Sequence, residues 1–184
     1  MPASGRSRRA WGWHRLVDEW AARIVVAAGV RPGELVLDIG AGTGALTAHL
    51  VRAGARVVAV ELHPGRAEVL RQRFPQITVV EADAVSLRLP RGPFRVVANP
   101  PYGITVEVLD LLLAAGTRLV AADLVLQRAV VRKYADQRVL RAARAHRMST
   151  GLVLPRHAFR PPPRVDSAVL VVRRRQGHCD QMKP

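Results

Sequence analysis

The stretch LVLDIGAGTG, residues 35–44, decides the fold class of this 184-residue chain. Its apolar first half predicts a buried strand, its three glycines predict a tight turn, and the residues that follow, to about Ala53, predict a helix. Glycines let a ligand approach the backbone closely, and a helix N-terminus supplies free N–H groups. With Ala45 the stretch also fits the dinucleotide pattern Gly-x-Gly-x-x-Ala, so alone it does not identify the ligand.

Strands and helices alternate on both sides of this stretch. Gly29 suits the end of the first helix, and Pro64 suits the first turn of a later one. The alternation predicts an α/β fold with a doubly wound, mostly parallel seven-stranded sheet that ends in an antiparallel hairpin. The expected strands are 34–39, 56–61, 77–80, 94–98, 119–126, 151–154 and 165–172, and the expected helices are 18–28, 45–53, 64–74 and 104–115.

Polar residues follow the ends of several predicted strands. Glu61 stands 21 positions after Gly40, where a carboxylate can accept both hydroxyls of a ribose. Asp83 can accept from an adenine amino group, or it can simply cap a loop. Several carboxylates in one pocket suit a positively charged cofactor better than a pyrophosphate, which favours S-adenosylmethionine and methyl transfer over hydride transfer. The candidate cofactor residues at this edge are Asp38, Gly40, Gly42, Glu61, Asp83 and Asn99.

The tetrapeptide Asn99-Pro100-Pro101-Tyr102 predicts a site for a planar substrate with an exocyclic amine. The two prolines remove two backbone donors, so the Asn99 amide and the Pro100 carbonyl remain as acceptors. An amine conjugated to a purine is a poor nucleophile, and two acceptors on its hydrogens free the nitrogen lone pair. Tyr102 adds a flat ring for stacking. The alternative is a proline-stiffened turn with a core tyrosine.

The charge balance predicts a polyanionic partner. The formal net charge is +15, with 29 basic against 14 acidic residues, and only Lys133 and Lys183 are lysines. Arginine suits phosphate and stacks on bases, so RNA or DNA is the first candidate. Each basic cluster taken alone favours a solvated face, whereas the clusters together, with the net charge of +15, favour contacts with phosphates. The candidate RNA-binding residues are Arg6, Arg8 and Arg9, then Arg128, Arg132, Lys133, Arg138, Arg141, Arg144 and Arg147 in a region expected to be helical or loop-like.

We expect a basic flexible arm over 1–13, one catalytic domain over 14–175 and a disordered tail over 176–184. The single cysteine, Cys179, excludes an intrachain disulfide and argues against a cysteine-based metal site. No charge-free apolar stretch is long enough to span a bilayer, and no signal peptide is evident. The expectation is a cytoplasmic monomer without a metal ion.

Taken together, these motifs resemble the rRNA adenine N6-methyltransferases. The matching segments are LDIGAGTGALT at 37–47, VVAVEL at 57–62, EADA at 81–84 and VVANPPY at 96–102. The segment FRPPPRVDSA at 159–168 is similar to the substrate-side loop and final strand of that family, and it is the most specific of the set. Within the family, the chain most resembles the 23S rRNA methyltransferases that give macrolide, lincosamide and streptogramin B resistance, in particular the short mycobacterial members.

The resemblance implies a Rossmann-like class I fold with S-adenosylmethionine as cofactor. It implies that Gly40, Glu61, Asp83 and Asn99 contact the cofactor. His14 and Leu16 fall in the N-terminal cofactor segment, where His14 replaces the usual asparagine and a backbone contact is expected. Family members typically continue into a helical C-terminal RNA-binding domain, which we expect to be absent here, so RNA affinity would come from the catalytic domain.

The implied reaction is N6-methylation of an adenine in 23S rRNA. The base would leave its stack and lie between Tyr102 and Phe159, with its amino hydrogens accepted by Asn99 and the Pro100 carbonyl. For Phe159 the alternative is a core anchor for the proline-rich loop. The alternative functions are a small-subunit rRNA methyltransferase, whose usual motif has leucine at the place of Pro100, a DNA adenine or protein glutamine methyltransferase, and a non-catalytic rRNA-binding assembly factor.

Overall fold

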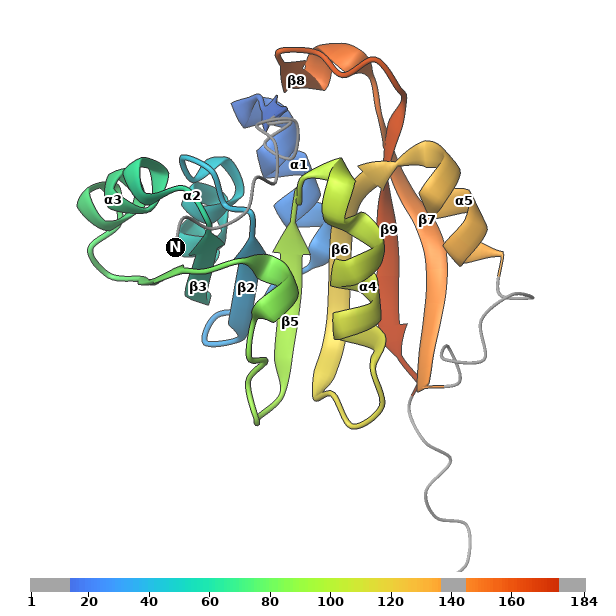
Figure 1. The fold of residues 1–184 in the computed structure, drawn as a ribbon, viewed down its shortest axis with the longest axis horizontal. Helices are drawn as coiled ribbons and strands as arrows, with labels where there is room; N and C mark the ends of the chain where they lie inside the picture. The colour runs from blue at the N-terminus through green and yellow to red at the C-terminus, as the bar shows by residue number, and fades with distance from the viewer. Residues whose placement is uncertain (1–13, 137–144, 176–184) are drawn as a thin grey trace, which may run out of the picture.

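The computed structural model describes residues 14–136 and 145–175, which form a single seven-stranded sheet with helices on both faces (Figure 1). The strand order is β4-β3-β2-β5-β6-β9-β7. Strands β4 to β6 are parallel, and β9 is antiparallel to both β6 and β7. The strands are β2 Leu35–Ile39, β3 Arg56–Glu61, β4 Thr78–Glu81, β5 Phe94–Ala98, β6 Leu119–Gln127, β7 His146–Leu154 and β9 Ser167–Arg174. The predicted α/β fold, with its mostly parallel sheet and final hairpin, is confirmed.

Two layers of helices follow from the alternation of side chains along the central strands. In β5, Val96 and Ala98 pack into the core cluster that contains the apolar faces of α4 and α5, whereas Val97 packs into the cluster of α1 and α2. Figure 1 shows α4 in front of the sheet and α1 behind it. The helices are α1 Asp18–Ala28, α2 Ala45–Arg52, α3 Pro64–Arg73, α4 Thr105–Leu113 and α5 Arg128–Ala135.

Strand β7 begins earlier than predicted. It starts at His146 rather than at Gly151, so Arg147 lies on a strand and not in a helix or loop. His146 and Met148 are buried and Arg147 is exposed, which is the ordinary alternation of a half-buried strand. A run of basic and small residues before it concealed this alternation in the sequence.

A small second sheet was not predicted. Strand β1, Arg15–Leu16, pairs antiparallel with β8, Phe159–Arg160. Two-residue strands carry no measurable periodicity, so sequence pattern cannot reveal them. The pairing joins the segment before α1 to the proline-rich loop between β7 and β9, and β8 lies above the carboxyl ends of the parallel strands (Figure 1).

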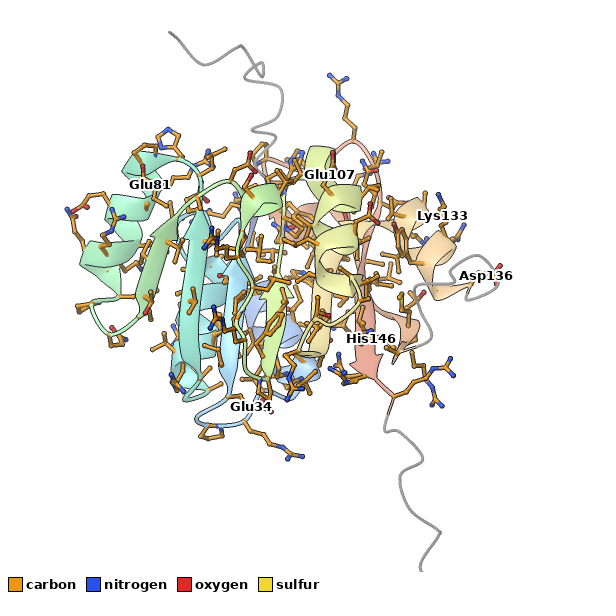
Figure 2. The ribbon with its side chains drawn as sticks, turned by 60° about the horizontal axis from the view of Figure 1, so that its bottom comes forward. Glu34, Glu81, Glu107, Lys133, Asp136 and His146 are labelled. Carbon is orange, nitrogen blue, oxygen red and sulfur yellow. The ribbon has the colours of Figure 1, made fainter. Side chains whose placement is uncertain are left out.

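Charged residues mark the two ends of the sheet (Figure 2). Glu81 lies at the end where the parallel strands terminate, and Glu34 lies at the opposite end. There the Glu34 carboxylate pairs with the Arg95 guanidinium at 3.0 Å, so this ion pair lies away from the ligand-binding edge. Within the described residues, no helix has both the length and the apolarity needed to cross a membrane.

Candidate active site

The glycine turn and the Asn-Pro-Pro-Tyr segment lie against each other. Gly40 has φ +73°, and a β-carbon there would lie 3.1 Å from Pro101 Cδ and 3.4 Å from Pro100 Cα. A side chain at position 40 would therefore separate the two motifs, which neighbouring parallel strands β2 and β5 bring to the same edge. The predicted proximity of these motifs is confirmed.

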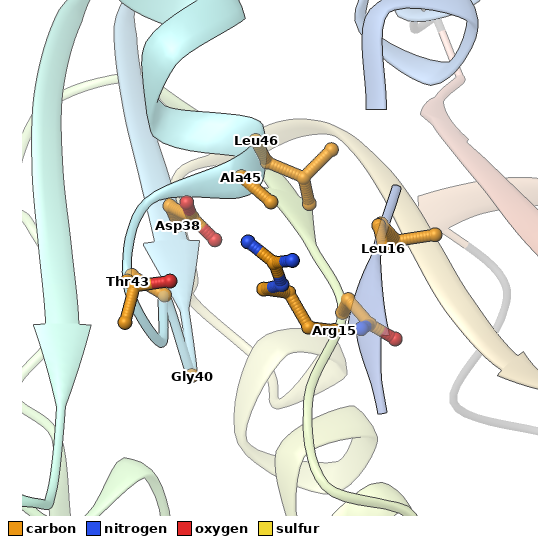
Figure 3. A pocket seen from close by; sticks show the side chains of 9 residues that line it. Arg15, Leu16, Asp38, Gly40, Thr43, Ala45 and Leu46 are labelled. Carbon is orange, nitrogen blue, oxygen red and sulfur yellow. The ribbon is translucent and has the colours of Figure 1, made fainter. Parts of the chain in front are cut away.

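A pocket opens beside this contact (Figure 3). It contains four residues that the sequence predicted for the cofactor and adds two polar residues, Arg15 and Thr43, that it did not. The lining residues are Arg15, Leu16, Asp38, Gly40, Ala41, Thr43, Ala45, Leu46 and Asn99. The pocket thus combines a carboxylate, a guanidinium, an amide and the start of α2.

Glu61 is held rigidly at the end of β3. The side chain is buried, and its Oε2 accepts from the Gly42 N–H at 2.8 Å while its Oε1 accepts from the His63 N–H at 2.9 Å. The carboxylate therefore fixes the glycine turn as well as placing acceptor oxygens at the sheet edge. This geometry suits the predicted ribose contact, since each carboxylate oxygen has a second lone pair.

Asp38 is a buried carboxyl group in the wall of the pocket. It is 1% exposed, and its Oδ2 accepts from the Thr47 hydroxyl at 2.7 Å. Burial raises the pKa of Asp38 from 3.8 to about 7, and the Thr47 hydrogen bond offsets only part of that rise. A cationic ligand group beside it would favour the charged form, so Asp38 is suited to an ammonium.

This pKa predicts a specific pH dependence of stability. Between the unfolded value of 3.8 and the folded value of about 7, the folded state binds a proton that the unfolded state releases, so the Asp38 contribution to the free energy of unfolding falls as pH rises. Asp38→Asn removes this titration. Urea denaturation should show the variant gaining stability relative to wild type between about pH 4 and about pH 7. A difference that stays constant with pH would contradict the assignment.

The Asn99 carboxamide has a defined orientation. Its Nδ2 donates to the His14 carbonyl at 2.8 Å. Because a carbonyl only accepts, the amide face toward His14 must be the NH2, and Oδ1 is the acceptor that remains. His14 is fixed in turn, since its Nδ1 lies 2.9 Å from the Pro161 carbonyl and must donate to it. The His14 backbone is therefore tied to Asn99; a direct contact with the cofactor stays a prediction.

Tyr102 follows Asn99 in a short 3₁₀ turn, Tyr102–Ile104, and is anchored through its hydroxyl. The Tyr102 hydroxyl lies 2.6 Å from the Ser167 hydroxyl at the start of β9. Burial raises the pKa of Tyr102 above 10.0. The ring that lies near it is that of His14, with centroids 5.8 Å apart. The hydrogen bond to Ser167 thus anchors the hydroxyl end of the predicted stacking ring.

Removing this hydroxyl is expected to affect stability more than catalysis. In Tyr102→Phe the aromatic face remains, but the fully buried Ser167 hydroxyl loses its partner, at a cost of about 1–3 kcal/mol in the free energy of unfolding. The double variant with Ser167→Ala should recover part of that loss in urea denaturation, because no hydroxyl then stays unpaired. If the double variant is less stable than Tyr102→Phe, the bond does not have this role.

Phe159 does not offer a stacking face, so that prediction is wrong for this structure. Its side chain is 1% exposed and packs in the core cluster with Leu16 and Trp20. Its strand partner is Leu16, and the adjacent Arg160 points to solvent, so the pleat turns Phe159 inward. The alternative interpretation, a core anchor for the proline-rich loop, describes what the structure shows.

Asp83 acts as a loop cap. Its Oδ1 accepts from the Val85 N–H at 3.2 Å, at the start of the 3₁₀ turn η2, Ala84–Ser86. This was the alternative interpretation of the residue. A contact to an adenine amino group stays a prediction, and the position of Asp83, two residues beyond β4 at the carboxyl edge, is compatible with it.

The predicted RNA-binding residues are only partly described. Arg6, Arg8, Arg9, Arg138, Arg141 and Arg144 lie outside the described residues. Arg128, Arg132 and Lys133 belong to α5, and Figure 2 shows Lys133 projecting from that helix away from the sheet. Arg128 and Arg132 also line a groove beside Asp166, the residue before Ser167. Arg128 and Arg132 therefore lie at the carboxyl edge of the sheet, near Ser167, whereas Arg147 pairs with Arg173 toward the opposite end of the sheet.

Comparison with known proteins identifies this arrangement. A family model described as ribosomal RNA adenine dimethylase matches residues 6–183. The chain belongs to this family. The 23S rRNA methyltransferase ErmE has a similar structure, with a TM-score of 0.80 and 33% identity over 87% of this chain and 69% of that one.

Sequence relatives include proteins named as rRNA methyltransferases without a stated subunit and proteins named as small-subunit rRNA methyltransferases. An rRNA methyltransferase of Streptomyces thermotolerans is 40% identical over 92% of this chain, and the chain spans 60% of its length. Ribosomal RNA small subunit methyltransferase A of Thermosynechococcus vestitus is 37% identical over 91% of this chain and 70% of its own length. S-adenosylmethionine is the cofactor of this methyltransferase family, as the sequence predicted. Among residues 14–136 and 145–175, no three His, Cys, Asp or Glu side chains are grouped as a metal site requires.

Proposed function

We propose that this chain transfers a methyl group from S-adenosylmethionine to the N6 atom of an adenine in 23S rRNA and thereby gives resistance to macrolide-type antibiotics. The observation that supports this most is the Asn99 amide. Its NH2 is engaged by the His14 carbonyl at the pocket wall, which leaves Oδ1 as an acceptor, and the carbonyl of the next residue, Pro100, is the second acceptor that we propose. Family membership supplies the reaction class.

The protein contributes by binding, orienting and accepting hydrogen bonds. The bound cofactor supplies an electrophilic methyl group on a sulfonium. Asp38 and Glu61 provide carboxylates for its ammonium and ribose, and Asn99 Oδ1 with the Pro100 carbonyl accepts the two N6 hydrogens, so that the nitrogen lone pair faces the methyl group. Orientation and proximity of this kind are worth about 7–11 kcal/mol of the barrier. No protein nucleophile is required, because N6 attacks the methyl group directly, and no strong general base is required, because the proton leaves N6 after the attack.

The target adenine must leave its stack to reach this edge. N6 of a stacked base is inaccessible to a pocket at the rim of a sheet, so the enzyme acts on an unstacked or flipped nucleotide. Tyr102, held by Ser167, supplies one stacking face. A stacking contact contributes about 1–3 kcal/mol per base.

Large-subunit rRNA is the preferred substrate class. The likeness to ErmE and to an rRNA methyltransferase from Streptomyces supports it, and so does proline at position 100. Small-subunit relatives also match, so 16S rRNA is the alternative that the experiment must address. An rRNA substrate agrees with the cytoplasmic location expected from sequence.

A labelled-methyl assay that offers 23S rRNA, 16S rRNA, DNA and protein separately tests this function. We expect label in 23S rRNA alone, recovered as N6-methylated adenosine after digestion, with primer extension mapping the modified position. Label confined to 16S rRNA would reassign the substrate to the small subunit. Label in DNA or protein would replace the rRNA proposal, and absence of S-adenosylmethionine binding would favour a non-catalytic binding protein.

RNA affinity should depend steeply on salt. Each phosphate that is neutralised contributes about 0.7–0.9 to the slope of log affinity against log salt. Arg128→Ala with Arg132→Ala should lower that slope by about one to two units. Arg71→Ala is the matched control, because Arg71 lies on α3 at the opposite edge of the sheet and pairs with Glu68 and Glu81. If the RNA affinity of wild type does not change with salt, or if the Arg71 variant and the α5 variant change the salt slope equally, α5 is not part of the RNA interface.

A further inference from the structure

Arg15 reaches into the cofactor pocket from β1. Figure 3 shows its guanidinium directed toward the wall that carries Asp38. Within residues 14–136 and 145–175, the Arg15 side chain has no hydrogen-bond or ion-pair partner. Its position follows from its neighbours rather than from its own contacts, since residue 16 pairs with Phe159 and the Val17 N–H donates to Ala158 at 2.9 Å.

The anchoring of β1 also involves the catalytic amide. Asn99 Nδ2 donates to the carbonyl of His14, the residue immediately before Arg15. The Arg15 Cα is therefore set by contacts on both sides, from β8 and from the end of β5. These backbone contacts direct the Arg15 side chain toward the pocket. Contacts made by the guanidinium are not needed to place it there.

The pocket thus has opposite charges on its two sides. Asp38 is buried in one wall, and its Oδ2 already accepts from Thr47, whereas the guanidinium of Arg15 enters from the other side. An α-amino acid group is a zwitterion with an ammonium and a carboxylate on one carbon. The arrangement matches it, because a guanidinium fork binds a carboxylate through two parallel N–H bonds and a carboxylate binds an ammonium.

We propose that Arg15 binds the α-carboxylate of the methionine portion of S-adenosylmethionine while Asp38 faces its ammonium. This assignment rests on the proposed function, and it makes Arg15 a residue that selects an intact amino-acid end on the cofactor. Arg73 is the competing cation. It lines an adjoining cavity together with Arg15, but its Nη1 already donates to the Thr43 carbonyl at 3.1 Å, and Arg73 does not line the pocket that contains Asp38.

Calorimetry with two ligands tests the assignment without any turnover. S-adenosylhomocysteine has the amino-acid end, and 5′-methylthioadenosine shares the adenosine and the sulfur but lacks that end. Arg15→Ala should weaken binding of S-adenosylhomocysteine about ten- to a hundredfold and leave binding of 5′-methylthioadenosine unchanged. Arg15→Lys should retain part of the affinity, because it keeps a point charge without the fork.

Arg160→Ala is the matched control. Arg160 is exposed and is the strand partner of Arg15 in the β1–β8 pair, but it does not line the pocket, so both ligands should bind as they do to wild type. Thermal unfolding of each variant checks that the fold is intact.

Five outcomes would overturn the assignment. Equal weakening of both ligands by Arg15→Ala would show a general effect on the pocket. Tighter binding of S-adenosylhomocysteine to that variant would show that the guanidinium competes with the ligand for Asp38. A loss of affinity for S-adenosylhomocysteine in Arg73→Ala alone would show that Arg73 binds the α-carboxylate. Unchanged binding of both ligands would remove Arg15 from cofactor recognition and leave the methyltransferase proposal standing, whereas failure of wild type to bind either ligand would end both proposals.

Discussion

Asn99→Ala is expected to lower the rate of methyl transfer by at least about 10²–10³-fold, the usual loss when one oriented group of a polar catalytic site is removed. The variant loses the Oδ1 acceptor and the Nδ2 donation to the His14 carbonyl, which spans 2.8 Å in wild type. S-adenosylhomocysteine should still bind measurably, because Asp38, Glu61 and the glycine turn are unchanged. Initial rates with labelled S-adenosylmethionine and calorimetry with S-adenosylhomocysteine separate the two effects.

Asn99→Asp distinguishes the two functions of the amide. The carboxylate keeps an acceptor toward the substrate but cannot donate to the His14 carbonyl, so the contact that holds β1 is lost. We expect this variant to bind S-adenosylhomocysteine more weakly than Asn99→Ala, because an oxygen then faces an oxygen. Full activity in Asn99→Ala would end the acceptor model.

Gly44→Ala is expected to lower the free energy of unfolding by about 2–5 kcal/mol, the sum of a left-handed backbone and an overpacked core. Gly44 has φ +90°, and a β-carbon there would lie 2.5 Å from Phe74 Cε2 and 3.1 Å from Leu70 Cδ2. Phe74 and Leu70 are 8% and 0% exposed, so neither can move aside into solvent. A change of this size is a large fraction of the stability of a typical domain.

Gly116→Ala is the control for the backbone contribution. Gly116 has φ +83°, close to that of Gly44, but its added β-carbon would meet nothing within 4 Å. This variant should lose only about 1–2 kcal/mol in urea denaturation, the cost of the left-handed conformation itself. Equal losses in the two variants would show that the contact between the glycine turn and α3 is not tightly packed.

Most of the sheet could be predicted because its strands are apolar runs separated by recognisable helix starts and stops. Gly29, with φ +62°, ends α1 as expected, and Pro64 begins α3. The pocket at the carboxyl edge followed from the same topology, since parallel strands bring Asp38, Glu61 and Asn99 to one side. The first half of strand β7 was missed because Met148 is the only apolar residue between His146 and Thr150, directly after a run of basic and small residues.

The residues that sequence reasoning missed are those fixed by contacts distant in the chain. Arg15 enters the pocket only because β1 pairs with β8, a pairing of two residues with no periodic signal. Ser167 was recognised as part of a motif but not as the partner of the Tyr102 hydroxyl. Phe159 was placed at the substrate because its motif lies on the substrate side; its orientation is set by the pleat of β8, which sequence position alone does not reveal.

The most direct test of the account is the distance between Asn99 Oδ1 and the adenine N6 atom in a crystal structure with S-adenosylhomocysteine and an adenosine nucleotide bound. We predict hydrogen bonds of about 2.7–3.2 Å from N6 to both Asn99 Oδ1 and the Pro100 carbonyl, with N6 facing the cofactor sulfur. An Asn99 amide turned away from the base, or a cofactor bound elsewhere than the pocket between Arg15 and Asp38, would contradict it.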